Sequence, residues 1–199
     1  DTYLPGEHDL VGVITGVVEK EIIITGENIK PGDVVLGLPS SGLHTNGYSF
    51  ARKLFFEISG YDVNNTIPEL EKSVGLTLLE PHINYTNHVF AALDAGINVK
   101  GIAHITGGGL VGNIPRVLPD GCGVEIHKGS WPSIPVFDVM QSVGDVDEDE
   151  MFRAFNMGIG MTFIVNPNDI GAVKDALKDL TEVCEIGFVV SGKNKVILK

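Results

Sequence analysis

The chain has few of the features that mark a nucleic-acid-binding, membrane or disulfide-stabilised protein. Its 199 residues include two cysteines, Cys122 and Cys184, which form neither a C-x-x-C pair nor a disulfide framework. Fourteen Lys and Arg stand against 26 Asp and Glu, a net charge of −12, so no basic stripe can neutralise a nucleic-acid backbone or an anionic bilayer. We therefore expect no nucleic-acid or membrane partner, and the sparse cysteine favours a reducing cytoplasm.

Long apolar runs and the common enzyme signatures are also missing. No run approaches the roughly 18 apolar residues that span a bilayer, and no secretory signal opens the chain. A G-x-S-x-G elbow, a Walker loop and a dinucleotide fingerprint are absent. His82 and His88 are six residues apart and do not share a helical face, so the sequence predicts no metal site. The chain begins at Asp1 without Met, so we expect further sequence upstream.

What the chain contains is an alternation of strand and helix patterns in a composition that is 43% hydrophobic. It predicts an α/β (α+β) fold with a mixed β-sheet covered by helices. Strands are expected at 9–24 (one strand or a hairpin), 34–36, 99–105, 124–126 (an edge strand), 159–165, 183–190 and 194–199. Helices are expected from 48 onward and at about 83–95, 110–118, 134–142 and 168–180, with residues 61–73 as an irregular connection.

Two helices carry predicted faces and caps. In the helix at 83–95 we expect Val89, Phe90 and Leu93 to face inward and Gly96 to end the helix. In the helix at 168–180 we expect Asn168 as the N-cap. The apolar face of that helix is predicted to consist of Ile170, Val173, Ala176, Leu177 and Leu180.

The most informative segment is the loop after residues 34–36, which is rich in glycine and hydrogen-bonding side chains and precedes a helical pattern from Tyr48. Unpaired N–H groups at a helix start favour a phosphate or carboxylate. His44 is our first candidate for moving a proton. The alternative is two turns with Asn46 capping the helix and no ligand. The predicted phosphate-binding residues are Ser40, Ser41, Gly42, Thr45, Asn46 and Gly47.

A second unit of strand, glycine loop and helix follows at 99–118. His104 alternates with Ala103 and Ile105 and so lies on the other face of its strand. Consecutive glycines indicate close backbone approach or positive φ, and an amide and a guanidinium follow that suit a phosphate or carboxylate. His104 is our second candidate for proton transfer, and the alternative is a hydrogen-bonded core histidine. The predicted binding residues are Thr106, Gly107, Gly108, Gly109, Asn113 and Arg116.

A third candidate pair follows the acidic run at 145–150, whose carboxylates suit a helix start. Arg153 and Asn156 are three residues apart on the expected helix, hence on one face, and we include both among the binding residues. The alternative for Arg153 is an ion pair with the acidic run.

Four segments, in this order, resemble the signature of the phosphoribosylformylglycinamidine cyclo-ligase family, also called aminoimidazole ribonucleotide synthetases. The matching segments are 16–20 (GVVEK), 40–49 (SSGLHTNGYS) with Arg52 and Lys53 behind it, 103–119 (AHITGGG through NIPRVLP) and 150–161 (EMFRAFNMGIGM). The resemblance spans nearly the whole chain, and the run at 44–47 argues against other members of the superfamily.

The resemblance implies a whole enzyme of two α/β domains, of which the first supplies most of the ATP and Mg²⁺ site and a dimer's β-barrel. Residues 25–199 would then be the second domain, which binds substrate and phosphate. Residues 1–24 would be the final strand region of a mostly missing first domain. ATP, Mg²⁺ and a homodimer would thus belong to the whole enzyme, with no metal or cofactor held tightly by this chain.

The implied reaction is the ATP-dependent ring closure of formylglycinamidine ribonucleotide to aminoimidazole ribonucleotide in purine biosynthesis. ATP would activate the formamide oxygen, an amidine nitrogen would attack, and phosphate would leave. We expect the chain to be inactive alone. The alternatives are an isolated phosphometabolite-binding module and a related ATP-dependent synthetase of the same superfamily.

Overall fold

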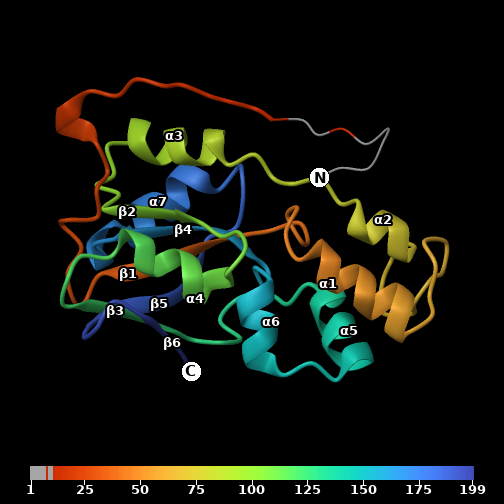
Figure 1. Ribbon diagram of the computed structural model, residues 1–199. Coiled ribbons are helices and arrows are strands. Elements are labelled where there is room, and N and C mark those ends of the chain that lie inside the picture. The colour runs from red at the N-terminus through yellow and green to blue at the C-terminus, as the bar shows by residue number, and fades with distance from the viewer. Residues whose placement is uncertain (1–7, 9–10) are drawn as a thin grey trace.

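The computed structural model describes residues 8 and 11–199 and confirms a mixed sheet covered by helices (Figure 1). Within those residues the strands are β1 Val34–Pro39, β2 Gly101–His104, β3 Cys122–Ile126, β4 Ile159–Val165, β5 Cys184–Ser191 and β6 Val196–Leu198. The α-helices are α1 Tyr48–Arg52, α2 Val74–Leu78, α3 Thr86–Asp94, α4 Gly109–Asn113, α5 Pro135–Gly144, α6 Glu148–Ala154 and α7 Ile170–Leu177. A π-helical stretch, Lys53–Ile58, continues α1, and 3-10 turns occupy Lys20–Ile22, Ile114–Val117 and Pro167–Asp169.

The six strands form one sheet in the order β2-β4-β1-β5-β3-β6 among the described residues. Strand β4 pairs antiparallel with both β1 and β2, and Met161 lies opposite Leu38 on one side and His104 on the other. Strands β1 and β2 therefore run in the same direction. The loops that follow them consequently leave the sheet at the same edge.

Buried side chains form layers on both faces of the sheet and a third cluster beside it. One face packs under α4, where Leu110 and Ile114 meet strand residues such as Ile126. The other face packs under α3 and α7, where Ala92 and Leu177 meet Phe163. Helices α1, α2, α5 and α6 build the third cluster beside the sheet (Figure 1). The loop between β1 and α1 thus joins the sheet to this helical cluster.

Several predicted elements are confirmed. Strand β4 has the predicted bounds, and α5 and α7 lie within or close to the predicted helices. Helix α6 starts after Asp147, whose side chain accepts from the Asp149 N–H, and the predicted acidic residues form its first turn. These carboxylates complement the helix dipole, as expected.

The predicted strand or hairpin at 9–24 is wrong for the described part of that segment; residues 9 and 10 lie outside it. Residues 11–19 have no regular secondary structure and expose their apolar side chains, with Val17 fully exposed. The segment runs along the outside of the molecule (Figure 1). A strand is stable only when its backbone groups pair, and within the described residues no strand pairs with this segment.

Two predictions about strand and helix faces are also wrong. Residues 124–126 are not an edge strand, because β6 pairs with β3 in parallel and forms the edge. On α3 the prediction holds for Val89, which packs against the core, but Phe90 is 56% exposed and Leu93 is 37% exposed, and the buried residues are His88 and Ala92. The buried face of α3 is therefore narrower than the face that its apolar residues predicted.

The last helix differs from its prediction at both ends. Asn168 is not its cap: the Asn166 side chain accepts from the Asn168 N–H and caps a 3-10 turn ahead of α7. The helix ends at Leu177, so Leu180 lies beyond it and is largely exposed. Short helix α2 was not predicted at all. Within the described residues, no helix is both long and apolar enough to cross a membrane, and both cysteines are free and buried.

Candidate functional site

The two glycine-containing loops meet at the edge of the sheet where β1 and β2 end. Asn46 Nδ2 in the first loop (residues 40–47) donates to Thr106 Oγ1 in the second loop (residues 106–109) at 2.7 Å. A Cβ on Gly107 would lie 3.3 Å from Asn46 Oδ1, so the two backbones approach closely. The structure therefore brings together two segments that lie about sixty residues apart in sequence.

The hydrogen-bonding side chains of the first loop are engaged within the protein. Ser40 Oγ donates to Asn156 Oδ1 at 2.9 Å, and Ser41 Oγ donates to the Pro81 carbonyl at 2.6 Å. Asn46 does not cap α1, because Gly47 is the N-cap residue. These contacts hold the loop in one shape, and their role in binding phosphate stays a prediction.

Asn156 ties the first loop to the segment after α6. It is 2% exposed, its Nδ2 donates to the Gly42 carbonyl at 2.8 Å, and its Oδ1 also accepts from the Gly158 N–H at 2.8 Å. The predicted shared helical face with Arg153 is wrong, since α6 ends at Ala154. Arg153 is instead exposed and pairs with Glu150 at 3.3 Å, the ion-pair alternative.

The second loop is held by side chains of the segment that follows it and leaves two of its backbone donors free. Asn113 Nδ2 donates to the Gly109 carbonyl at 2.8 Å, and Arg116 Nε, in the 3-10 turn that follows α4, donates to the Gly112 carbonyl of α4. The N–H groups of Gly107 and Gly108 donate no hydrogen bond within the part of the chain that the structure describes. Packing requires glycine at position 109, because a Cβ there would lie 1.9 Å from the Phe152 carbonyl oxygen.

The backbone of the first loop is strained at its histidine. His44 and Thr45 have φ values of 52° and 62°, which side chains other than glycine rarely adopt. The ring of His44 lies over Gly160 of β4, where a Cβ would be 2.8 Å from His44 Cε1 and 2.1 Å from the Tyr85 hydroxyl. Such strain persists where the surrounding structure enforces it, and it gathers at functional sites.

His44 is held as a neutral ring. It is 1% exposed, and its Nε2 accepts from the Ser41 N–H at 3.0 Å, so its proton is on Nδ1, which has no partner. Burial, then the neighbouring His82 and His104, lower the pKa of His44 to about 4. A neutral, enclosed imidazole is a poor proton acceptor at neutral pH.

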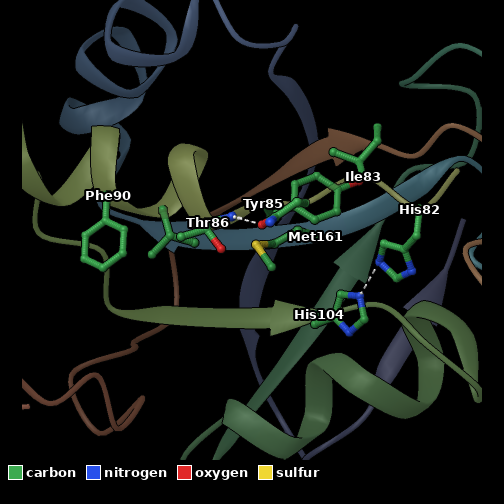
Figure 2. Close-up of a pocket in the computed structure, with 9 residues that line it drawn as sticks. His82, Ile83, Tyr85, Thr86, Phe90, His104 and Met161 are labelled. Atoms are coloured by element: carbon green, nitrogen blue, oxygen red, sulfur yellow. Dashed lines mark hydrogen bonds between the residues drawn. The ribbon is translucent and has the colours of Figure 1, made fainter. Parts of the chain in front are cut away.

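Two further histidines lie beside His44, and one of them was missed by the sequence reading. The His82 ring stacks on His44 with centroids 4.2 Å apart, and its Nε2 lies 3.2 Å from His104 Nε2 (Figure 2). Both His82 and His104 are exposed, and burial followed by His82 lowers the pKa of His104. No sequence signal marks His82, because only the fold brings residues 44, 82 and 104 together.

A cavity of about 550 Å³ opens beside these rings. His82 and His104 line one part of it, and Phe90, Thr86 and Met161 line another (Figure 2). Tyr85, also unpredicted, lines it too and donates its hydroxyl proton to the Pro39 carbonyl at 2.6 Å. Burial raises the pKa of Tyr85, so its hydroxyl stays protonated. The cavity therefore combines an apolar wall with an accessible imidazole.

The described residues do not offer a site for Mg²⁺. Among them, no group of three or more His, Cys, Asp or Glu side chains is arranged to hold a metal ion. The single buried carboxylate of that part of the chain, Asp33, accepts from Lys100 Nζ at 2.6 Å and from the Lys30 N–H. The charge of Asp33 is therefore already compensated by these contacts.

Known proteins share both the sequence and the fold of this chain. The family "AIR synthase related protein, C-terminal domain" matches residues 30–199. A phosphoribosylformylglycinamidine cyclo-ligase from Thermoanaerobacter sp. (strain X514) is 45% identical over 197 residues, which are 98% of this chain and 58% of that protein. The chain thus spans less than two thirds of the length of this curated relative.

Solved structures show the same fold at low sequence identity. The hydrogenase maturation protein HypE of E. coli aligns with a TM-score of 0.58 and 22% identity over 92% of this chain and 51% of that one. PurL of T. maritima, solved in complex with FGAR, aligns with a TM-score of 0.53 and 16% identity over 88% of this chain and 27% of that one.

Proposed function

This chain belongs to the AIR synthase related C-terminal domain family, and we propose that it is the substrate-binding half of a phosphoribosylformylglycinamidine cyclo-ligase. The whole protein would use ATP to close the ring of formylglycinamidine ribonucleotide and release aminoimidazole ribonucleotide. The observation that carries the proposal is the 45% identity to a cyclo-ligase across 98% of this chain. The FGAR complex of a protein with the same fold supports a ribonucleotide of this class.

We assign the phosphate contact first to the second loop. The free N–H groups of Gly107 and Gly108 are suited to an anion, because oriented backbone donors bind phosphate without needing a basic side chain. The first loop would shape the cleft beside it, with its side chains already bonded to the protein. His104 would face the reacting atoms, since it is accessible from the cavity whereas His44 is enclosed.

Ring closure requires a proton acceptor and the exclusion of water. When the amidine nitrogen attacks the activated formamide carbon, it must lose a proton. An accessible, uncharged imidazole is suited to accept that proton. The apolar wall that Phe90 and Met161 provide would limit hydrolysis of the activated intermediate. ATP and Mg²⁺ belong, in this proposal, to the remainder of the protein, because this chain supplies no cation site among its described residues.

Two features support further parts of the proposal. The exposed apolar residues between 11 and 23, such as Val13 and Ile14, suit burial against the rest of the protein and a second copy in a homodimer. Both cysteines are free thiols, which suits a reducing cytoplasm.

The experiment that tests the proposal compares the whole protein with this chain. Both are incubated with ATP, Mg²⁺ and formylglycinamidine ribonucleotide, and aminoimidazole ribonucleotide is measured. We expect ring closure by the whole protein and none by the chain alone. No product from the whole protein would contradict the cyclo-ligase assignment, and product from the chain alone would contradict the half-enzyme assignment.

The second candidate is a phosphometabolite-binding module without turnover. The first loop favours this candidate, because the hydrogen bonds of Ser40 and Asn46 fix its surface through contacts within this chain alone. Calorimetric titration of the chain with formylglycinamidine ribonucleotide tests it. Binding by this chain together with no turnover by the whole protein would support the module over the enzyme.

A further inference from the structure

Three imidazole rings lie in a row beside the cavity, and the proposed function involves only His44 and His104. His82 comes from the loop before α3, stacks on His44 and meets His104 through a short N···N contact of 3.2 Å. We propose that His82 is a positioning residue that receives, through His104, the proton that the substrate loses during ring closure. This inference rests on the proposed function and extends it to a residue that no sequence motif marks.

The hydrogen bonds around His82 have one consistent direction. Thr45 has a single hydroxyl proton, and Thr45 Oγ1 donates it to the His44 carbonyl at 2.6 Å. Towards His82 Nδ1, 3.3 Å away, Thr45 Oγ1 can therefore only accept, which places a proton on Nδ1 of His82. Neutral His82 then has a lone pair on Nε2, and His104 Nε2–H donates to it.

This direction leaves the other ring nitrogen of His104, Nδ1, with a lone pair. Within the described residues no group bonds to Nδ1 of His104, and the side chain lines the cavity (Figure 2). When a substrate N–H bond breaks, the proton forms a new N–H bond at His104 Nδ1. The proton on His104 Nε2 moves to His82 Nε2, and the positive charge comes to rest on His82.

The surroundings restrict the cluster to one charge. The titratable groups that face His82 are His44 beneath it and His104 beside it, with Tyr85 across the His44 ring at 6.0 Å. The pKa values of His44 and His104 are lowered by burial and by His82, so both rings resist a charge of their own. Glu80, two residues before His82 in the sequence, pairs its carboxylate with Lys72. His82 is exposed, like His104, but His82 also donates to Thr45 in both of its charge states.

The first test reads the proton positions and needs no activity. The chain is labelled with ¹⁵N in histidine, and long-range ¹H–¹⁵N spectra at pH 8 identify the tautomer of each ring, assigned with His82→Gln and His104→Gln. We expect the Nδ1–H tautomer for His82 and the Nε2–H tautomer for His104. The opposite tautomer at either residue would overturn the proposal.

The second test measures ring closure by the whole protein. In His82→Gln, the amide oxygen can still accept from His104 but cannot take its proton. We expect kcat to fall about 10- to 100-fold with KM changed less than about threefold, and the acid limb of the kcat/KM profile to move by at least about half a pH unit. His127→Gln, which removes a surface histidine beside Glu125, should leave all three unchanged.

A second variant guards against a purely structural effect. His82→Asn keeps a donor towards Thr45 but is too short to reach His104, so it should lose kcat at least as strongly as His82→Gln. Wild-type kcat with an unmoved acid limb in either variant would overturn the relay. If the whole protein closes no ring at all, the proposed function fails, whereas the tautomers measured in the chain decide the proton arrangement separately.

Discussion

The two loops that leave the same edge of the sheet both contain glycines and both connect a strand to a helix, but they differ in construction. The first, residues 40–47, is fixed by its own side chains and encloses His44, with two non-glycine residues at positive φ. The second, residues 106–109, is fixed by a hydrogen bond from the Asn113 side chain and leaves the N–H groups of Gly107 and Gly108 without a partner among the described residues. His104, just before this loop, is exposed. A glycine-rich loop between a strand and a helix can thus be a rigid wall or an open cradle, and only its hydrogen-bond partners distinguish the two.

The largest effect should come from Gly109, where the second loop packs on α6. In Gly109→Ala the new Cβ would lie 1.9 Å from the Phe152 carbonyl oxygen, at a φ of 58°. We expect the free energy of unfolding to fall by about 3 kcal/mol or more, measured by urea denaturation. Gly112→Ala is the matched control, because no atom lies within 4 Å of its added Cβ, and it should be neutral or stabilising. Equal losses in both variants would show that the second loop is not fixed through α6.

The next largest effect should come from Asn156, which holds the first loop. Asn156→Ala removes the partners of Ser40, Gly42 and Gly158 in a buried place. We expect a loss of about 2–4 kcal/mol in the free energy of unfolding, because buried groups would remain unpaired. The exposed Asn168→Ala serves as the control and should change stability by less than about 0.5 kcal/mol. A small loss at Asn156 would mean that the first loop is less rigid than its contacts suggest.

The enclosed His44 should make the stability of the fold depend on acid pH. Its pKa is lowered from about 6.5 in the unfolded chain to about 4 in the fold, so the unfolded state binds the proton more readily between these values. The His44 contribution is therefore fully present above pH 6.5 and is lost as the pH falls towards 4. Compared with His44→Gln, the wild type should lose about 1–3 kcal/mol more between pH 7.5 and pH 4.5 in denaturation experiments. Parallel pH profiles of the two proteins would contradict a neutral, enclosed ring.

The smallest effect should come from Arg153, which lies outside both loops. Its pair with Glu150 is exposed and three residues apart on one helix, so Arg153→Ala should cost less than about 0.5 kcal/mol. In the whole protein, KM for formylglycinamidine ribonucleotide should change less than about twofold. A tenfold rise in KM would instead restore the predicted binding role of Arg153 and extend the site beyond the two loops.

Local patterns in the sequence predict the six strands of the sheet, the main helices and both loops, because each depends on neighbouring residues. Strand β4 and the acid-started α6 are examples. What the sequence could not predict depends on contacts between distant segments. His82 becomes part of the site only because the fold places the loop before α3 next to the end of β2. Residues 124–126 are not at the edge of the sheet only because β6 pairs with β3. The role of the residues at 9–24 also depends on partners outside the segment.

Strand β4 has a consequence for the size of the ligand that this edge can accept. Because β4 lies between β1 and β2, the two loops begin two strand spacings apart, roughly 10 Å. That spacing at the base of the loops belongs to the sheet, so exchanging loop residues would change which atoms face a ligand and how the loops meet through Asn46 and Thr106, but not the separation of the two points where the loops begin. To engineer this edge for a larger or smaller molecule, one would have to change β4, the strand that carries Gly160 and separates the two loops.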